Sequence, residues 1–250
     1  MILLEKKSFM WLIFLSAMPL VTGFQKTSTN RSLPGFAVVE LFTSEGCSSC
    51  PPADEAVKDI AGKYKLNVFV LGFHVDYWNY LGWKDPFSKP DYSERQKQYA
   101  LIFSLNTIYT PQIIVNGKTE FVGSDKNKLE ETVTRELKMV VGSPIQLYAK
   151  EERDNEIEVK YNTEKTQGDI INIALVQVQA ENNISEGENE GKVLHHINAV
   201  RDFKIGELNG SGPVLLHFPA GLSKKDCKII AFLQDKKTMR ILSAASADIY

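Results

Sequence analysis

The stretch FAVVELFTSEGCSSCPPAD, residues 36–54, decides the fold of this chain. Its first seven residues form an apolar run that predicts a buried strand. The two prolines suit the first turn of a helix, where backbone N–H groups have no partner within the helix. Cys47 and Cys50 therefore lie at a strand-to-helix turn, which is the arrangement of a thiol–disulfide redox site. The positive end of the helix dipole favours the reactive thiolate at this place.

These two cysteines are the candidate catalytic residues. We expect Cys47, which is nearer to the helix start and more exposed, to be the attacking thiol, and Cys50 to resolve the mixed disulfide. The alternative is a static structural disulfide or a pair of inert thiols. A disulfide between such close residues removes little chain entropy from the unfolded state, so it would stabilise the fold poorly.

The N-terminal residues have the pattern of a signal peptide. Lys6 and Lys7 precede a short apolar run at 9–15, and small residues follow as far as Gly23. We expect residues 1–23 to be a signal peptide and residues 24–35 to be a polar leader, with a retained membrane anchor as the alternative. Export implies an oxidising compartment, and no contact with a membrane is expected beyond the signal segment.

Composition excludes several classes of function. The chain has 250 residues, a formal net charge of −2 and three cysteines, which is too few for a disulfide scaffold. It has no basic stripe with interleaved aromatic residues, so we expect no nucleic-acid partner. It also lacks a glycine-rich loop of the kind that holds phosphates, and we expect no cofactor. The sequence does not predict an oligomeric state.

The apolar and turn patterns predict two domains. Residues 36–142 have the order β-α-β-α-β-β-α, and Gly142-Ser143-Pro144 breaks the last helix. Asn116-Gly117 predicts a two-residue hairpin turn, and Ser124 is a candidate cap of the last helix. Residues 143–250 predict an all-β, sandwich-like domain. Its candidate strands are 145–150, 155–163, 169–180, 192–200, 213–218, 227–234 and 239–247.

The first predicted domain resembles the thioredoxin-like superfamily. The resemblance rests on the element order, on Cys47 and Cys50 at the first strand–helix turn, and on Thr110-Pro111 before the third strand. It implies an α/β domain with a central mixed sheet, in which the peptide bond before Pro111 is cis and faces the cysteine pair. Thr110 and Pro111 then become candidate substrate-binding residues, because an extended partner chain can pair with the backbone there.

A narrower resemblance covers nearly all of the mature chain. The segments FTSEGCSSCPPAD (42–54) and HVDYW (74–78) are similar to a family of exported bacterial thioredoxin-like proteins of uncharacterised function. The acidic segment GENEG (187–191), which we expect to be an exposed loop, and the residues after it are similar to the β-rich C-terminal domain of that family. This resemblance implies export to the periplasm or cell envelope of a bacterium and gives no substrate.

Three polar residues are candidates for accessory roles. Glu40 lies within an apolar strand and could relay protons, although thioredoxins place an acidic residue one position nearer to the first cysteine. The alternative is a glutamate paired with a nearby cation. His74 and Asp76 share one face if their strand continues. Trp78 begins an aromatic loop that could cover the site and bind an apolar peptide, or could simply fill a small core.

The remaining histidines and cysteine predict no site. His195 and His196 are adjacent and point to opposite faces of a strand, so ordinary strand roles are expected. Cys227 is unpaired and begins an apolar strand, which favours a small buried residue.

The predicted function is exchange of the Cys47–Cys50 disulfide with thiols or disulfides of another exported protein. This would make the chain a thiol–disulfide oxidoreductase. One alternative is a copper(I) chaperone that uses Cys47, Cys50 and His74 as soft ligands. A second alternative is a binding module whose C-terminal domain acts while the cysteine pair is only structural.

Overall fold

The structure is a computed structural model that describes residues 34–139, 144–152, 155–164, 168–207 and 213–250. The predicted signal peptide and nearly all of the predicted leader lie outside the described residues. Residues Ser32–Tyr250 belong to one compact unit. Within the described part, no helix is both long enough and apolar enough to cross a membrane.

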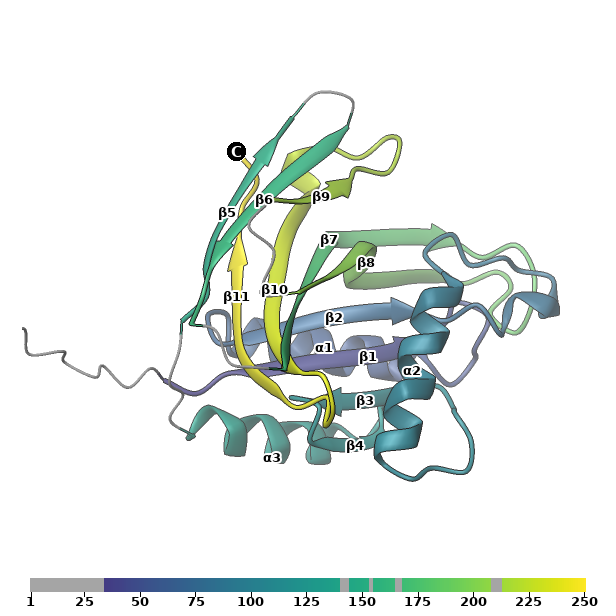
Figure 1. The fold of residues 1–250 in the computed structure, drawn as a ribbon. Coiled ribbons are helices and arrows are strands. Elements are labelled where there is room, and N and C mark those ends of the chain that lie inside the picture. Colours follow the sequence, from purple (N-terminus) through teal and green to yellow (C-terminus); the bar gives the residue numbers. More distant parts are fainter. Residues whose placement is uncertain (1–33, 140–143, 153–154, 165–167, 208–212) are drawn as a thin grey trace, which may run out of the picture. The chain divides into compact units, whose positions relative to one another are not determined.

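Three α-helices and eleven strands make up the described chain (Figure 1). In chain order these elements are β1 (Ala37–Thr43), α1 (Pro51–Lys63), β2 (Val68–His74), α2 (Pro90–Ile102), β3 (Gln112–Val115), β4 (Thr119–Val122), α3 (Lys126–Leu137), β5 (Gln146–Glu151), β6 (Glu156–Asn162), β7 (Asp169–Asn183), β8 (Val193–Glu207), β9 (Val214–His217), β10 (Cys227–Asp235) and β11 (Ile241–Ala247). The predicted order β-α-β-α-β-β-α is present in the first half, and seven strands follow it.

A single mixed sheet runs through both halves of the chain. Its eight strands lie in the order β11-β10-β7-β8-β2-β1-β3-β4, and a second, antiparallel sheet has the order β5-β6-β9. Strand β1 is parallel to β2 and antiparallel to β3. Strand β8 joins the halves, because Ala199 pairs with Gly72 of β2. The boundary predicted near residue 142 therefore lies between elements that share the large sheet.

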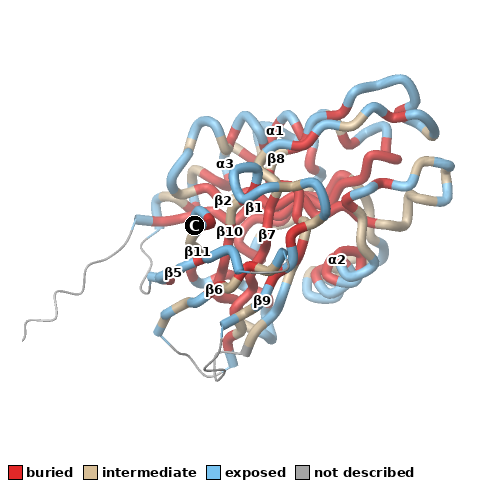
Figure 2. Tube along the Cα trace, turned by 90° about the horizontal axis from the view of Figure 1, so that it is seen from above, coloured by how far each residue is buried: buried red, intermediate tan, exposed pale blue. Residues whose placement is uncertain are grey.

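The core follows from the alternation of side chains along buried strands. In β1, Val38 and Phe42 join the hydrophobic cluster under α2, whereas Val39 and Leu41 join the cluster under α1 and α3. A third cluster lies between β5, β6 and β9 of the small sheet and strands β7 and β10 of the large one. Figure 2 shows the buried residues concentrated in the sheets, with exposed residues in the loops and on the outer helix faces.

Two local details differ from the sequence predictions. The turn after β3 has three residues, 116–118, because Val115 pairs directly with Thr119. Asn116 and Gly117 both have positive φ, at 51° and 61°, as the hairpin prediction required. Helix α3 is capped by Asp125 rather than by Ser124, since the Asp125 side chain accepts from the backbone N–H of Lys128 at 2.9 Å.

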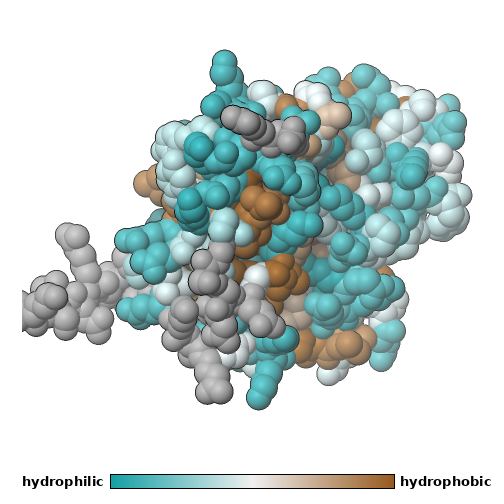
Figure 3. All heavy atoms as spheres, turned by 45° about the horizontal axis from the view of Figure 1, so that its top comes forward, coloured by the Kyte–Doolittle hydropathy of each residue, from teal (hydrophilic) through white to brown (hydrophobic). Residues whose placement is uncertain are grey.

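The face drawn in Figure 3 is mostly hydrophilic, with hydrophobic residues gathered in a few patches. Large apolar side chains that are exposed include Ile205, Leu215 and Tyr148. Such scattered exposure is ordinary for a folded domain and defines no site by itself.

Candidate functional site

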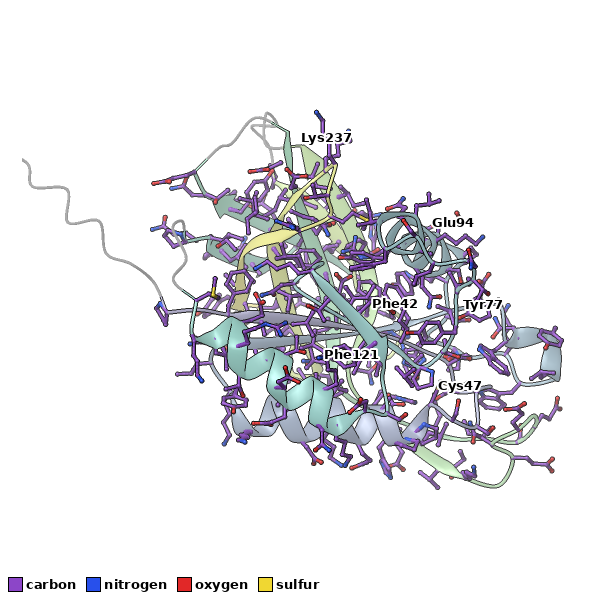
Figure 4. The ribbon with its side chains drawn as sticks, turned by 90° about the horizontal axis from the view of Figure 1, so that it is seen from below. Phe42, Cys47, Tyr77, Glu94, Phe121 and Lys237 are labelled. Carbon is purple, nitrogen blue, oxygen red and sulfur yellow. A yellow bond between two sulfur atoms is a disulfide. The ribbon has the colours of Figure 1, made fainter. Side chains whose placement is uncertain are left out.

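The end of β1 leads directly into the cysteine loop, and α1 follows it. Cys47 and Cys50 form a disulfide with their Cα atoms 5.4 Å apart, and Cys50 is the N-cap residue of α1. Pro51 and Pro52 occupy the first turn, as expected from their missing N–H groups. Figure 4 shows Cys47 beyond the end of the strand that contains Phe42. The disulfide thus lies at the predicted strand-to-helix turn.

The prediction that Cys47 is the more exposed cysteine is wrong for this structure. Cys47 is 0% exposed and Cys50 is 1% exposed, while Ser48 and Ser49 between them are exposed. A distant segment, the connection between β7 and β8, contacts the cysteine loop. There Asn189, itself buried, donates from Nδ2 to the backbone oxygens of Glu45 at 2.8 Å and Cys47 at 2.9 Å. The loop expected to be exposed therefore carries one buried residue that contacts the site.

Three predicted substrate-binding residues lie together. Trp78 donates from Nε1 to the hydroxyl of Thr110 at 2.8 Å, and the peptide bond between Thr110 and Pro111 is cis. Trp78 also packs against the cysteine loop, since a Cβ added to Gly46 would lie 3.1 Å from the Trp78 Cβ. A Cβ at position 46 would crowd Trp78, so a glycine suits this close approach. The indole, the threonine and the loop before Cys47 thus form one continuous group.

Pro111 is tied to the helix that follows the disulfide. Its backbone oxygen accepts from the N–H of Gly123 at 2.9 Å. A Cβ added to Gly123 would lie 3.0 Å from the Cβ of Ala53 and 3.1 Å from that of Pro111. The first turn of α1 and the start of β3 therefore approach each other through a glycine. Pro111 itself is buried.

A buried charged cluster lies beside the disulfide loop, and the sequence did not predict it. His196 of β8 lies between two carboxylates, with Nδ1 3.0 Å from Asp54 Oδ1 and Nε2 3.1 Å from Glu45 Oε1. Both ring nitrogens can donate only in the protonated imidazole. Burial lowers the pKa of His196, but the hydrogen bonds and charges of Asp54 and Glu45 outweigh it and raise the pKa to about 10. The imidazolium ion is thus the stable form at neutral pH.

Glu45, in the turn after β1, is the centre of this cluster. Its side chain is fully buried and also accepts from Asn182 Nδ2 at 2.7 Å and from Trp83 Nε1 at 2.8 Å. Asp54 has a second contact with the hydroxyl of Thr43 at 3.4 Å. Buried carboxylates need several donors, and this cluster supplies them from both halves of the chain.

His74 lies next to the cluster but has its own acidic partner. Its Nδ1 is 2.7 Å from Asp85 Oδ2, and its ring lies edge-on to His196 with centroids 4.7 Å apart. Burial raises the pKa of Asp85, but His74 and the backbone donors of Glu45 and Phe87 outweigh it and hold this pKa below its usual value. The Nε2 atom of His74 is buried and has no hydrogen-bond partner among the residues that the structure describes.

Two other predicted accessory residues are directed elsewhere. Asp76 accepts from the hydroxyl of Ser93 on α2 at 2.6 Å. Glu40 forms two hydrogen bonds with Arg95, at 2.5 and 3.0 Å, and a third with Tyr99, all on the α2 face of the sheet. Glu40 therefore matches the expected alternative of a glutamate paired with a cation, and its hydrogen bonds connect α2 to the core.

The described residues contain no cluster of three or more His, Cys, Asp and Glu side chains arranged to hold a metal ion. Cys227 is buried and free, and burial raises the pKa of its thiol to about 11. His195 is exposed and lies 3.1 Å from Glu181, on the opposite face from His196. The expectation of opposite faces is confirmed, and His196, within β8, is paired with two carboxylates.

Four site residues had only weak signals in the sequence. Glu45, Asp54 and Asn189 lie within the segments that carry the family resemblance, but nothing in their spacing indicates burial. His196 lies in a strand of alternating pattern, where a buried position can hold any residue that finds a partner. Its partners come from the turn after β1 and from α1, more than 140 positions earlier in the chain.

The chain matches one family model and is similar to solved structures of other proteins. A family model described as "Protein of unknown function (DUF1223)" matches residues 38–234. A solved structure of an Agrobacterium tumefaciens protein from a structural genomics consortium is 29% identical, with a TM-score of 0.63 over 84% of this chain and 92% of that one. HBP35 of Porphyromonas gingivalis is similar in fold, with a TM-score of 0.55, 17% identity, and coverage of 87% and 76%. No curated protein matches this chain.

Proposed function

Because this chain belongs to the DUF1223 family of proteins of unknown function, its activity has to be argued from the site, and we propose that it is an exported thiol–disulfide oxidoreductase. The observation that carries the proposal is the Cys47–Cys50 disulfide at the start of α1, beside Trp78, Thr110 and the cis Pro111. A cysteine pair at a helix N-terminus suits thiolate chemistry.

The fold of the first half supports this proposal. Strands β2, β1, β3 and β4 are neighbours in that order, with β3 antiparallel to β1, and α1 starts at the disulfide. This order agrees with the thioredoxin-like domain that the sequence resembles, and we propose that residues 36–142 have that fold. The small sheet packed on β7 and β10 supports a sandwich-like second half.

The proposed reaction is a pair of thiol–disulfide exchanges. A thiolate of the partner protein attacks Cys47 Sγ, the bond between Cys47 and Cys50 breaks, and Cys50 leaves as a thiolate that takes a proton. A second thiolate of the partner then attacks the partner sulfur that is bonded to Cys47 in the mixed disulfide, and Cys47 is released as a thiolate. The partner is oxidised to a disulfide and Cys47 and Cys50 are reduced. In the opposite direction the Cys47 thiolate attacks a partner disulfide and Cys50 resolves the intermediate.

Export to the envelope of a bacterium is part of the proposal. The pattern of the first 23 residues supports it, and a disulfide is stable in the oxidising compartments to which such segments lead. The partner would then be another envelope or secreted protein with accessible cysteines.

The first experiment is the equilibrium reduction potential of the Cys47–Cys50 pair in glutathione or dithiothreitol buffers, with Cys227→Ala as background. We expect a value between about −120 and −270 mV, the range of redox-active oxidoreductases. Cys50→Ser should then trap a mixed disulfide with a reducible test protein, and Cys47→Ser should trap none. A potential well below about −300 mV would instead indicate a structural disulfide and would leave the function to the C-terminal half.

One observation favours the copper(I) alternative. The Nε2 atom of His74 is buried without a partner in the described part of the chain, while Asp85 holds Nδ1, and an acidic partner of this kind orients histidine ligands in metal sites. Copper(I) would need the reduced cysteines as its other ligands, and they would have to move toward His74, because the described residues hold no ready cluster of three such ligands. Stoichiometric copper(I) retention that is lost in Cys47→Ser and weakened in His74→Ala would favour this function over disulfide exchange.

A further inference from the structure

The buried disulfide raises a question of access. An attacking thiolate must reach the sulfur of Cys47, and this residue is 0% exposed although both serines beside it lie at the surface. Some part of the surroundings has to move before any protein thiol can react. The helix and strands around the loop are fixed in the core, since Ala53 of α1 and Leu41 of β1 belong to one hydrophobic cluster.

The connection between β7 and β8, residues 184–192, is the segment best suited to move. It is closed on itself by hydrogen bonds from Ile184 N–H to the Lys192 oxygen and from Gly191 N–H to the Ile184 oxygen. Most of its residues are exposed, apart from Ile184 and Asn189. Gly187 and Gly191 have positive φ, at 80° and 76°, which lets the segment turn back over the site.

Few polar contacts connect this segment with the cysteine loop, and Asn189 makes two of them. Its Nδ2 group donates to the oxygens of Glu45 and Cys47, while Lys192 Nζ donates to its Oδ1 at 2.9 Å. The lysine contact fixes which end of the amide faces the loop. The third contact is weaker, because the Glu188 carboxylate that accepts from Ser48 N–H at 3.0 Å is exposed.

We propose that residues 184–192 form a cover that must leave the disulfide before a protein thiol attacks Cys47, and that Asn189 is the positioning residue that holds the cover closed. The identity of the attacking group rests on the proposed function, but the cover itself does not. When the cover leaves, the oxygens of Glu45 and Cys47 need new donors. Backbone N–H groups of an extended partner chain can supply them, so the cover occupies the place of such a chain.

The test measures how fast dithiothreitol reduces the oxidised mature chain in a Cys227→Ala background, followed by alkylation of the released thiols. Asn189→Ala and the equally sized Asn189→Asp, which has no donor, should be reduced at least about fivefold faster, because two hydrogen bonds to the closed state are lost. Glu188→Ala, at an exposed position that tolerates change, should accelerate reduction about twofold. Asn183→Ala, an exposed asparagine of the same hairpin, is the matched control and should change the rate little.

A second readout separates a cover from a merely loosened disulfide. A glutamate-specific protease should cleave within residues 186–190 faster in the Asn189 variants, by the same factor as the reduction, since both reactions require the same opening. Faster reduction without faster cleavage, or equal reduction rates in all folded variants, would overturn the proposal. Failure of the proposed function appears elsewhere, in the reduction potential and in the amount of mixed disulfide finally trapped, because these end points do not depend on the rate of opening.

Discussion

Replacing His196 by glutamine tests the buried charged cluster most directly. The histidine pKa rises from 6.5 to about 10 on folding, because hydrogen bonds to Asp54 and Glu45 outweigh burial. A pKa difference of one unit corresponds to roughly 1.4 kcal/mol, so a rise of the His196 pKa from 6.5 to about 10 corresponds to a contribution of about 5 kcal/mol to the folding free energy. Glutamine removes this contribution and leaves two buried carboxylates without their cation, so we expect a loss of about 3–5 kcal/mol near pH 6.

The pH dependence gives the sign of the effect. Below pH 6.5 the histidine is protonated in both states, and its whole contribution is present. Above that pH the unfolded state loses the proton while the folded state keeps it. Stability from His196 therefore falls by about 1.4 kcal/mol per pH unit and is exhausted near pH 10. Between pH 7 and 8.5 the wild type should lose about 2 kcal/mol that the variant does not lose.

Urea denaturation of both proteins at pH 6, 7 and 8.5 measures these values. In the difference between the unfolding free energies of wild type and His196→Gln, the contributions of groups that titrate equally in both proteins cancel. The thiol of Cys227, whose pKa rises from 9.0 to about 11 on folding, affects stability mainly above pH 9, and both chains contain it. The groups that face His196 are Glu45, Asp54 and the His74–Asp85 pair. A difference in unfolding free energy that is the same at pH 7 and 8.5 would refute a protonated His196 in the folded state.

Two further predictions concern the core. Arg95→Met should destabilise the chain by about 3–5 kcal/mol, because Glu40 remains buried without its cation, and adding Glu40→Leu should restore part of the loss in urea denaturation. An equal loss of unfolding free energy in Arg95→Met and in the double variant would contradict this. Gly117→Ala should cost at least about 2 kcal/mol, since the new Cβ would lie 1.9 Å from the Met239 oxygen at a φ of +61°. Gly62→Ala in α1, with no atom within 4 Å, is its control and should leave the melting temperature unchanged or higher.

The sequence by itself determined the local elements around the cysteine pair. An apolar run, a Cys-x-x-Cys spacing and two prolines were enough to place a strand, a turn and a helix at residues 36–63, because each of these signals acts over a few neighbouring residues. Asn116-Gly117 likewise indicated the hairpin between β3 and β4, although the observed turn is one residue longer. Trp78, Thr110 and Pro111 were selected from the sequence as candidate substrate-binding residues, and in the structure Trp78 contacts Thr110.

Only the tertiary structure decided how the two halves of the chain meet at the disulfide. Strand β8 joins the sheet next to β2, and this pairing brings His196 to Asp54 and Glu45 and brings Asn189 to the oxygen of Cys47. These contacts join residues that are more than 140 positions apart, and a periodic pattern carries no information on partners at such a distance. The burial of Cys47 was likewise decided only by the tertiary structure. Its place at a strand-to-helix turn predicted exposure, whereas in the structure it is buried and its backbone oxygen accepts from Asn189 of the other half of the chain.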